Sequence, residues 1–573
     1  MKKIRICVLI TLTIMLLFVG PLVSSASLSA SVTLTSSGII SSGGSTSGSA
    51  CTISISGSTV TVTSGKGSTI YSGTSVDTAW DDAFTYVASG GTITVDPGTY
   101  TATLQNPSTG IYGGLYGDCY SGFITAYLKN VNINFQSGAI LTMSTSGTMD
   151  AIWSLWYCNN VKITGMTLNG NAPNEDCNTH VGSVGIMIYD SNNTVVTDST
   201  IYNCRTYGFT DGSNYQDVSV PCGITDCTIY DCYWNGICFD DNRISGDYAI
   251  GNTVYDCSDC GISTWGASVV ILNNYIYNIN GTDGWAGVGT GSHYGIALEG
   301  GYQCLVENNT IVNCPSIGIC DGDAQGTPYS NLIIDNSISK SAQGIDVWTN
   351  GYDTITQNTI TGWSPAGGNA ILVMGCETWL SPNTIISYNT IGSPSGSAGT
   401  AYGIIDNGAS NCSICDNTMT IPTSDTNVYG IYLATFESVV SSYNLIEGNT
   451  VQAHSGITIA DSGCSDNKIS GNTLTACTVA ISNSGTGTIV NPSSSSTYSL
   501  TLNDPYSTIA VTPAQGTHVY SSGTQVSITV SPTTGYTLNV DGSNVTLTSG
   551  TYTVKMTQDN FAYVISTAGI SGP

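Results

Sequence analysis

Asn309-Thr310-Ile311 is one copy of a short sequence that recurs through residues 165–485. Other clear copies are Asn252-Thr253-Val254, Asn358-Thr359-Ile360, Asn389-Thr390-Ile391, Asn449-Thr450-Val451 and Asn472-Thr473-Leu474. With weaker copies counted, the repeat recurs every 22 to 35 residues. Each period holds short β-branched or aromatic runs broken by Gly, Asn, Asp and Ser, and no window keeps a 3.6-residue pattern. The repeat therefore predicts a solenoid whose coils are built of strands.

A second short sequence, Gly-Ile-x-apolar, lies between copies of the first. It occurs at Gly185-Ile186, Gly236-Ile237, Gly295-Ile296, Gly344-Ile345, Gly403-Ile404, Gly430-Ile431 and Gly456-Ile457. Stacked coils place the asparagines of the first repeat about 4.8 Å apart, so their amides can form a hydrogen-bonded ladder. We expect this ladder to hold a tight bend, since Asn tolerates the left-handed conformation. The ladder comprises Asn252, Asn274, Asn309, Asn336, Asn358, Asn389, Asn417, Asn449 and Asn472.

These repeats resemble the right-handed parallel β-helix of the pectate-lyase-like superfamily, in particular its carbohydrate-binding and sugar-hydrolase repeats. The entry sequence Gly90-Gly91-Thr92-Ile93-Thr94-Val95 resembles that of the same superfamily. The resemblance implies an all-β solenoid of about a dozen or more coils over residues 73–490. A capping helix is expected at residues 74–89, with Ala79, Ala83, Phe84 and Val87 on its buried face. The fold serves lyases, hydrolases, epimerases and adhesins, so it leaves the activity open.

The segments outside the solenoid indicate an exported protein. Residues 1–26 combine a basic start, an apolar run and Ser24-Ser25-Ala26, which is typical of a signal peptide. The alternative, a membrane anchor, is disfavoured because about fourteen apolar residues are short for a span. We predict a Ser/Thr/Gly-rich leader or cap at 27–72, a linker at 491–497 and a small β domain at 498–573. This domain resembles β modules repeated in bacterial surface proteins, so we expect a secreted or cell-surface location.

The charge narrows the choice of partners. The full chain has a net charge of −27, and without the signal 8 basic residues face 38 acidic ones, a net charge of −30. This charge argues against nucleic acid and anionic lipid, and against polyanionic glycans unless cations bridge the two. Only 9% of the residues are charged, so the surface is polar mainly through hydroxyls and amides, which suits neutral sugars.

Three cysteines occupy one place in consecutive coils: Cys204, Cys232 and Cys257. Neighbouring coils bring equivalent Cα atoms within the range that a disulfide accepts, and exported proteins oxidise such pairs. We therefore predict a bridge from Cys232 to Cys204 or Cys257. Metal binding is the alternative for the pairs Cys257/Cys260 and Cys412/Cys415, but no second pair lies at zinc spacing.

The Gly-Ile strands predict where chemistry is located. Their alternation places Tyr189, Gly212, Asp240, Trp265, Glu299, Gly322 and Trp348 in one outward row, with Cys238, Ser263, Ala297, Cys320 and Asp346 in the row beside it. Asp240 and Glu299 then lie two coils apart, about 9–10 Å between backbones, with Trp265 between them. This separation suits an inverting glycoside hydrolase, and aromatic rings suit stacking on sugars. We predict Asp240 and Glu299 as catalytic residues, and a binding groove of Tyr189, Asp241, Arg243, Trp265, His293, Asp346 and Trp348.

Comparison with the superfamily's motifs leaves catalysis open. Asp240-Asp241 matches one polygalacturonase motif, but the chain has no Gly-His-Gly, and Arg243-Ile244-Ser245 lacks the expected lysine. Asp321-Gly322-Asp323 is nearest to the calcium-binding cluster of pectate lyases, so calcium stays open while no other metal or cofactor is expected. The sequence favours a surface β-helix that binds polysaccharide and leaves its cleavage undecided. The alternative is a non-catalytic, adhesive or structural rod of roughly 60 Å.

Overall fold

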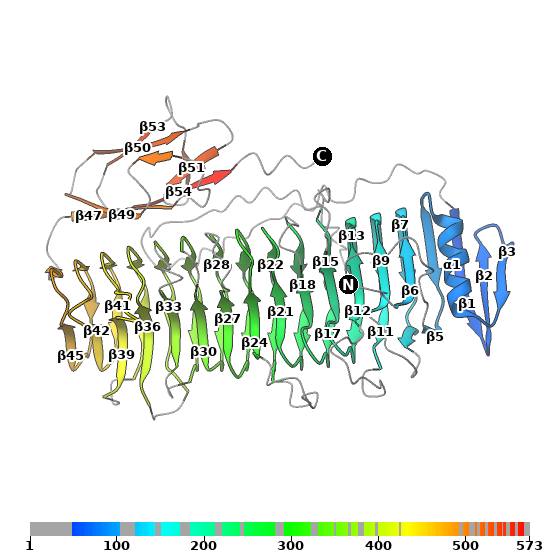
Figure 1. Ribbon diagram of the computed structural model, residues 1–573, viewed down its shortest axis with the longest axis horizontal. Coiled ribbons are helices and arrows are strands. Elements are labelled where there is room, and N and C mark those ends of the chain that lie inside the picture. Colours follow the sequence, from blue (N-terminus) through cyan, green and yellow to red (C-terminus); the bar gives the residue numbers. More distant parts are fainter. Residues whose placement is uncertain are drawn as a thin grey trace, which may run out of the picture.

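The computed structural model is an elongated stack of β coils (Figure 1). It describes residues 49–491 except for 103–120, 144–150, 172–183, 213–220, 241–245, 281–291, 323–329, 349–350, 365–367, 376–382, 396–398 and 423–425. Beyond residue 496 it describes the strands between 497 and 566. Within these residues, no helix is long and apolar enough to cross a membrane.

Each coil contributes one strand to each of three sheets, which are parallel except where β1, β2 and β3 pair antiparallel, so the chain forms a parallel β-helix. Sheets 2 and 3 have 14 strands each, which confirms the predicted solenoid of a dozen or more coils. Sheet 1 comprises β1(Ser49–Ser56), β2(Thr59–Ser64), β3(Thr69–Gly73), β4(Gly91–Val95), β7(Lys129–Phe135), β10(Asn159–Thr164), β13(Asn192–Thr197), β16(Gly223–Thr225), β19(Tyr248–Ile250), β22(Val270–Leu272), β25(Leu305–Glu307), β28(Leu332–Ile334), β31(Thr354–Thr356), β34(Ile385–Ser387), β37(Ser413–Cys415), β40(Leu445–Glu447), β43(Lys468–Ser470) and β46(Ile489–Asn491).

Sheets 2 and 3 carry the two short repeats. Sheet 2, which follows the ladder asparagines, comprises β5(Gly98–Ala102), β8(Ala139–Met143), β11(Thr167–Asn169), β14(Thr200–Tyr202), β17(Thr228–Tyr230), β20(Thr253–Tyr255), β23(Tyr275–Tyr277), β26(Thr310–Val312), β29(Ser337–Ser339), β32(Thr359–Thr361), β35(Thr390–Ile391), β38(Thr418–Thr420), β41(Thr450–Gln452) and β44(Thr473–Leu474). Sheet 3, which holds the Gly-Ile sequences, comprises β6(Ser121–Ala126), β9(Ala151–Trp156), β12(Val184–Tyr189), β15(Phe209–Gly212), β18(Ile237–Phe239), β21(Cys260–Thr264), β24(Tyr294–Leu298), β27(Ile317–Asp321), β30(Gln343–Val347), β33(Asn369–Met374), β36(Ala401–Asn407), β39(Val428–Ala434), β42(Ser455–Ile459) and β45(Val479–Asn483).

The predicted asparagine ladder is confirmed along its whole length. Asn309 donates from Nδ2 to Asn336 Oδ1 at 3.0 Å, and its backbone N–H donates to the same oxygen at 3.0 Å. The same pair of bonds recurs from Asn252 to Asn472. The ladder asparagines do not adopt the left-handed conformation themselves, contrary to expectation. The preceding residue does, as at Asn308 (φ 51°) and Gln357 (φ 59°), because the bend is completed one position earlier.

Replacing Asn358 by Ala should lower the free energy of unfolding by about 1–3 kcal/mol. Its amide nitrogen donates to Ile333 O, Thr356 O and Asn389 Oδ1, and its Oδ1 accepts two bonds from Asn336. All of these groups are buried, so alanine leaves them unpaired. Denaturant unfolding measures the change. Thr359→Ala is the control, because Thr359 is the next residue and is exposed. An unchanged midpoint for Asn358→Ala would contradict a stabilising ladder.

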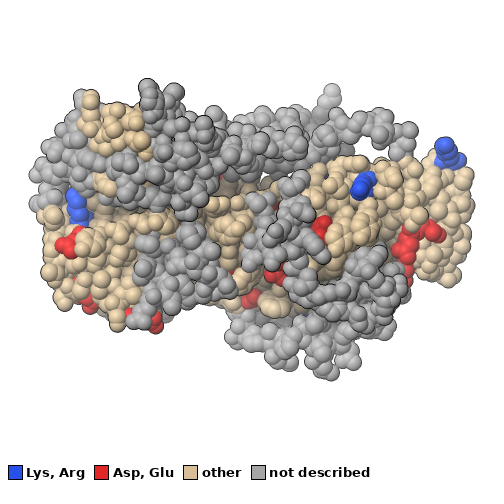
Figure 2. Space-filling view, turned by 45° about the horizontal axis from the view of Figure 1, so that its top comes forward, with Lys and Arg blue, Asp and Glu red and all other residues tan. Residues whose placement is uncertain are grey.

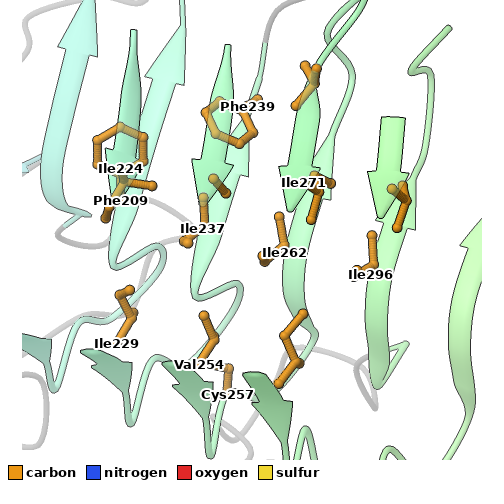
Figure 3. Close-up of a cluster of buried hydrophobic side chains, with 14 of the residues drawn as sticks. Phe209, Ile224, Ile229, Ile237, Phe239, Val254, Cys257, Ile262, Ile271 and Ile296 are labelled. Atoms are coloured by element: carbon orange, nitrogen blue, oxygen red, sulfur yellow. The ribbon is translucent and has the colours of Figure 1, made fainter. Parts of the chain in front are cut away.

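One continuous core runs through the stack and is closed at the N-terminal end by a helix. Ile and Phe side chains from successive coils pack in rows (Figure 3), including Phe209, Ile237 and Ile262, all fully buried. The helix α1(Val76–Val87) begins at Ser75, whose hydroxyl accepts from Thr78 N–H at 3.1 Å. Its buried face contains the four predicted residues together with Trp80, which confirms the capping helix.

The predicted disulfide is absent. Cys204, Cys232 and Cys257 are free thiols that point into the core, and the Sγ atoms of Cys232 and Cys257 bond to carbonyl oxygens two residues earlier at 3.6 and 3.5 Å. Equivalent residues of neighbouring coils have parallel side chains, so their Cβ atoms stay near the strand spacing of about 4.8 Å, beyond the 3.5–4.5 Å that a disulfide requires. These cysteines act as small apolar core residues.

The C-terminal segment is a separate set of strands, as the sequence indicates. One sheet contains β47(Thr497–Asn503), β49(Gly516–Ser521), β51(Tyr536–Val540), β52(Ser543–Val545) and β54(Asn560–Ser566). A second contains β48(Ala510–Thr512), β50(Gln525–Ser531) and β53(Thr551–Lys555). Pairing here is mostly antiparallel, unlike the solenoid.

Candidate functional site

In each Gly-Ile strand of sheet 3, the glycine and the isoleucine that follows it both face the core. A Cβ on Gly295 would lie 2.5 Å from the carbonyl oxygen of Gly318 and 2.6 Å from Ile311 Cγ2, so only glycine fits. Ile296 and Leu298 follow and are fully buried. The outward face of sheet 3 is therefore formed by the residue before each glycine and by the second and fourth residues after it.

The register confirms the row that contains Cys238 and most of the row that contains Asp240, but at Glu299 the ladder shifts by one residue, since Gly300 N–H bonds to Thr264 O at 3.4 Å. Cys238, Ser263, Ala297, Cys320 and Asp346 are successive strand partners. In the other row, Tyr189 pairs with Gly212, and the backbone N–H groups of Asp240, Trp265 and Trp348 continue the ladder with bonds of 2.8 Å to the preceding coil. The direction of most of these side chains was thus predictable from the repeat.

Several residues of these outward rows are buried. Asp346, Ser263 and Ala297 are fully buried although they lie on the outward side of the sheet. Trp265 is half-buried, with its ring over Gly300, whose Cβ position lies 2.7 Å from Trp265 Cε3. Outward position and solvent exposure are therefore separate properties in this protein.

Asp240 and Glu299 share a common neighbourhood. Burial is the main cause that raises the pKa of the Tyr207 phenol, and the carboxylates of Asp240 and Glu299 raise it further. Both carboxylates also raise the pKa of the buried Cys238 thiol, again after burial. Asp240 is exposed and Glu299 is half-buried. Two strand spacings separate their backbones, about 10 Å, which leaves room for a sugar ring and a water molecule.

The sequence analysis did not predict three further side chains near Asp240 and Glu299, those of Tyr207, Trp234 and Asp259. The Trp234 indole donates from Nε1 to Asp259 Oδ2 at 2.6 Å, and its ring lies 5.5 Å from the Tyr207 ring. Asp259 also raises the pKa of Tyr207, so it belongs to the same group. These residues precede the glycines by one or two positions, and this recurrence of aromatic and acidic residues was the available signal. We call Tyr207, Trp234, Asp240, Asp259, Trp265 and Glu299 the central cluster.

Other predicted binding residues are distributed differently. Tyr189 is buried against Trp156, with ring centroids 4.3 Å apart, so it is a packed residue and not an open platform. His293 is half-buried in a left-handed turn, next to Tyr294, whose N–H donates to Asp259 O at 2.9 Å. This contact places His293 at the edge of the central cluster. Asp241 and Arg243 lie outside the described residues.

The nearest calcium candidate does not face the surface. Asp321 is an inward residue, fully buried, and its Oδ1 accepts from Asn331 Nδ2 at 2.9 Å. Asp323 lies outside the described residues, and among those described no group of three or more His, Cys, Asp or Glu side chains is arranged to hold a metal ion.

A second aromatic group lies further along the same face of sheet 3. The rings of Tyr402, Tyr429 and Tyr432 are mutually 4.9–5.4 Å apart and half-buried. Burial is the first cause that raises the pKa of Tyr402 and Tyr432. Aromatic side chains therefore occur along this face of sheet 3 between β15 and β39.

The fold and these rows define a member of a known family. The family described as "Right handed beta helix region" matches residues 111–246, 150–332 and 323–497, so the chain belongs to this family. The protein is a right-handed parallel β-helix, as the repeats indicated.

Several solved structures are similar at low identity. The catalytic unit of an α-1,3-glucanase from Streptomyces thermodiastaticus strain HF3-3 is 16% identical, with a TM-score of 0.45, covering 65% of each chain. A tailspike mutant of E. coli bacteriophage HK620 in complex with a pentasaccharide is 14% identical, with a TM-score of 0.40, covering 86% of this chain and 88% of that one. A pectate lyase is 16% identical, with a TM-score of 0.34, over 52% and 70%. No curated protein sequence matches the chain.

Proposed function

We propose that this protein is secreted or displayed at a cell surface and binds a neutral polysaccharide along the outward face of sheet 3. The observation that carries the proposal is the central cluster. There the carboxylates of Asp240 and Glu299 both raise the pKa of the Tyr207 phenol and of the Cys238 thiol, beside the rings of Trp234 and Trp265. Indole and phenol rings offer apolar faces to sugar rings, and carboxylates accept hydrogen bonds from sugar hydroxyls.

The surface charge supports a neutral ligand. Few Lys or Arg side chains appear on the face drawn in Figure 2, where uncharged residues cover most of the described surface. The chain as a whole is strongly acidic, so a polyanionic glycan would be repelled. The signal-like start of the chain supports export.

We further propose that the central cluster cleaves the bound chain by inverting hydrolysis. One of the carboxyl groups of Asp240 and Glu299 gives its proton to the glycosidic oxygen, and the other takes a proton from water. The water oxygen then bonds to the anomeric carbon as the glycosidic bond breaks. The spacing of about two strands supports this pairing.

Replacing Trp265 by Ala should weaken polysaccharide binding by about 1–3 kcal/mol and leave the fold intact, because it removes a stacking ring from the centre of the groove. Affinity electrophoresis in gels with hydroxyethyl cellulose, lichenan, galactomannan, arabinoxylan or dextran measures binding, with polygalacturonate as the anionic comparison. Tyr275→Thr is the matched control, because Tyr275 is 44% exposed on sheet 2 and threonine restores the repeat there. Equal retardation of Trp265→Ala and the parent would refute this groove.

The alternative, a non-catalytic rod, is supported by one feature of sheet 2. The rings of Tyr202, Tyr230, Tyr255 and Tyr277 stack in register, with centroids 5.0, 4.9 and 4.8 Å apart and planes within 9°. Together with the asparagine ladder, such a stack stiffens the solenoid. Absence of retardation in every gel would favour this rod over the binding function.

A further inference from the structure

Asp346 and Trp348 occupy neighbouring outward positions at the end of β30. Asp346 is fully buried, and its Oδ1 accepts from Asn369 Nδ2 at 2.7 Å. Asn369 is held in turn by Gln343, whose Nε2 donates to Asn369 Oδ1 at 3.2 Å. The Cβ and backbone of Trp348 lie beside Gly322, whose Cβ position is 3.0 Å from Trp348 Cβ. The Asp346 side chain is therefore fixed in place by the neighbouring strand β33.

Each of these two side chains has one polar atom that is buried without a hydrogen-bond partner. The atoms are Asp346 Oδ2 and Trp348 Nε1. The indole N–H groups of Trp153, Trp234 and Trp363 each donate to a protein oxygen, whereas that of Trp80, inside the core, is also unpaired. An unpaired buried polar group costs free energy, so two of them on one outward face need an explanation.

The position of this pair separates it from the other unpaired acids. Asp321 and Asp406 also have a buried Oδ2 without a partner, but they lie on inward positions of sheet 3, paired with core residues such as Val347 and Leu433. Those carboxyl groups lie on the core side of the sheet. Asp346 is instead the strand partner of Cys320 and Leu372 in the outward row, on the face that carries the central cluster.

The protonation of Asp346 determines which kind of ligand atom fits. Burial raises the pKa of this carboxyl to about 8, and the hydrogen bond from Asn369 opposes that rise. The titratable groups that face it are Tyr294 of β24 and Cys320 of β27, and the neighbouring β33 contributes only the Asn369 amide. At neutral pH the carboxyl is thus protonated, and Oδ2 carries the proton because Oδ1 accepts from Asn369. Oδ2 and Trp348 Nε1 are both hydrogen-bond donors.

We propose that Asp346 Oδ2 and Trp348 Nε1 form a subsite in which each donates a hydrogen bond to an ether or hydroxyl oxygen of a neutral sugar unit. The inference rests on the proposed polysaccharide binding and extends it. The subsite lies two strands beyond Glu299, about 10 Å along the solenoid, so it holds a unit next to the one at the central cluster. Oxygen atoms of the ligand then satisfy both buried donors.

Three variants test the subsite by affinity electrophoresis in the same five neutral polysaccharides. Trp348→Phe removes one donor and keeps the ring, and Asp346→Leu removes the other, so each should weaken binding about 10-fold or more. Asp346→Asn keeps an N–H donor at the position of Oδ2 and should bind like the parent at about pH 6. The parent should lose affinity between about pH 6 and pH 9 as Asp346 ionises, and Asp346→Asn should not.

The inward Asp406→Asn is the matched control, and thermal melting of each variant verifies folding. Parent binding with unchanged affinity in Trp348→Phe and Asp346→Leu would overturn the subsite and leave the proposed function standing. Equal weakening by Asp406→Asn would assign the effect to loosening of the fold and would also overturn it. Failure of the parent to bind any of the five polysaccharides would overturn both proposals.

Discussion

The protein should be most stable in mildly acidic solution and should lose stability as the pH rises towards about 8. Three fully buried carboxyl groups carry this expectation. Burial raises the pKa of Asp406 to about 7 and that of Asp346 to about 8. Burial and the nearby Asp353 raise the pKa of Asp321 well above its ordinary value.

The sign of the effect follows from proton binding. In the unfolded chain an Asp carboxyl loses its proton near pH 4, whereas the folded protein keeps these protons up to about pH 7–8. The folded state binds more protons across that window, so the free energy of unfolding falls as the pH rises. The contribution of each buried carboxyl group to the free energy of unfolding is fully present below about pH 4. It is lost as the pH rises through the pKa of that group in the folded protein. For Asp406 it is on the order of 4 kcal/mol.

Denaturant unfolding between about pH 4.5 and pH 9 measures this dependence. Asp406→Asn should flatten it, because an amide keeps the shape of the side chain and does not titrate. Asp466→Asn, at an exposed residue in the left-handed conformation that Asn tolerates, should leave the slope unchanged. A slope that is the same in Asp406→Asn as in the parent would contradict the role of the buried acids.

The repeat made most of the solenoid predictable. An asparagine that recurs before a strand has to satisfy buried backbone groups, and Asn309 does so through four hydrogen bonds to its neighbours. A glycine that recurs before an isoleucine marks a position without room for a Cβ, as at Gly295. Both inferences depend only on stacking equal coils, so they hold for every copy.

The site was less predictable because it departs from the repeat. Alternation fixed the outward direction of Cys238 and Asp346, but it contains no information on what packs over them, and both are buried. Trp234 and Asp259 lie in turns before the Gly-Ile strands, where spacing varies between coils. The Cα atoms of Cys204 and Cys232 lie at a spacing that a disulfide accepts, but their parallel Cβ bonds keep the Cβ atoms too far apart for one.

If the central cluster hydrolyses its ligand, Asp240→Asn and Glu299→Gln should each lower turnover by about 10²–10⁴-fold. Each change removes one proton-transfer group and keeps the size of the side chain, so binding should stay within a few-fold of the parent. Release of reducing ends from the polysaccharide that the gels identify measures turnover, and proton NMR of the first product identifies its anomeric configuration. Inversion is expected from the separation of about two strands.

Asp256→Asn provides the matched control, because this residue follows Tyr255 of sheet 2, away from the outward face of sheet 3. It should leave turnover unchanged. Parent protein that binds polysaccharide without releasing reducing ends would refute the hydrolase and retain a binding protein in which Trp265 and Trp348 hold the chain. Turnover that survives in both Asp240→Asn and Glu299→Gln would instead move the chemistry elsewhere on the same face. Asp259 would be the next carboxylate to replace, since it accepts a hydrogen bond from Trp234 and also raises the pKa of the Tyr207 phenol.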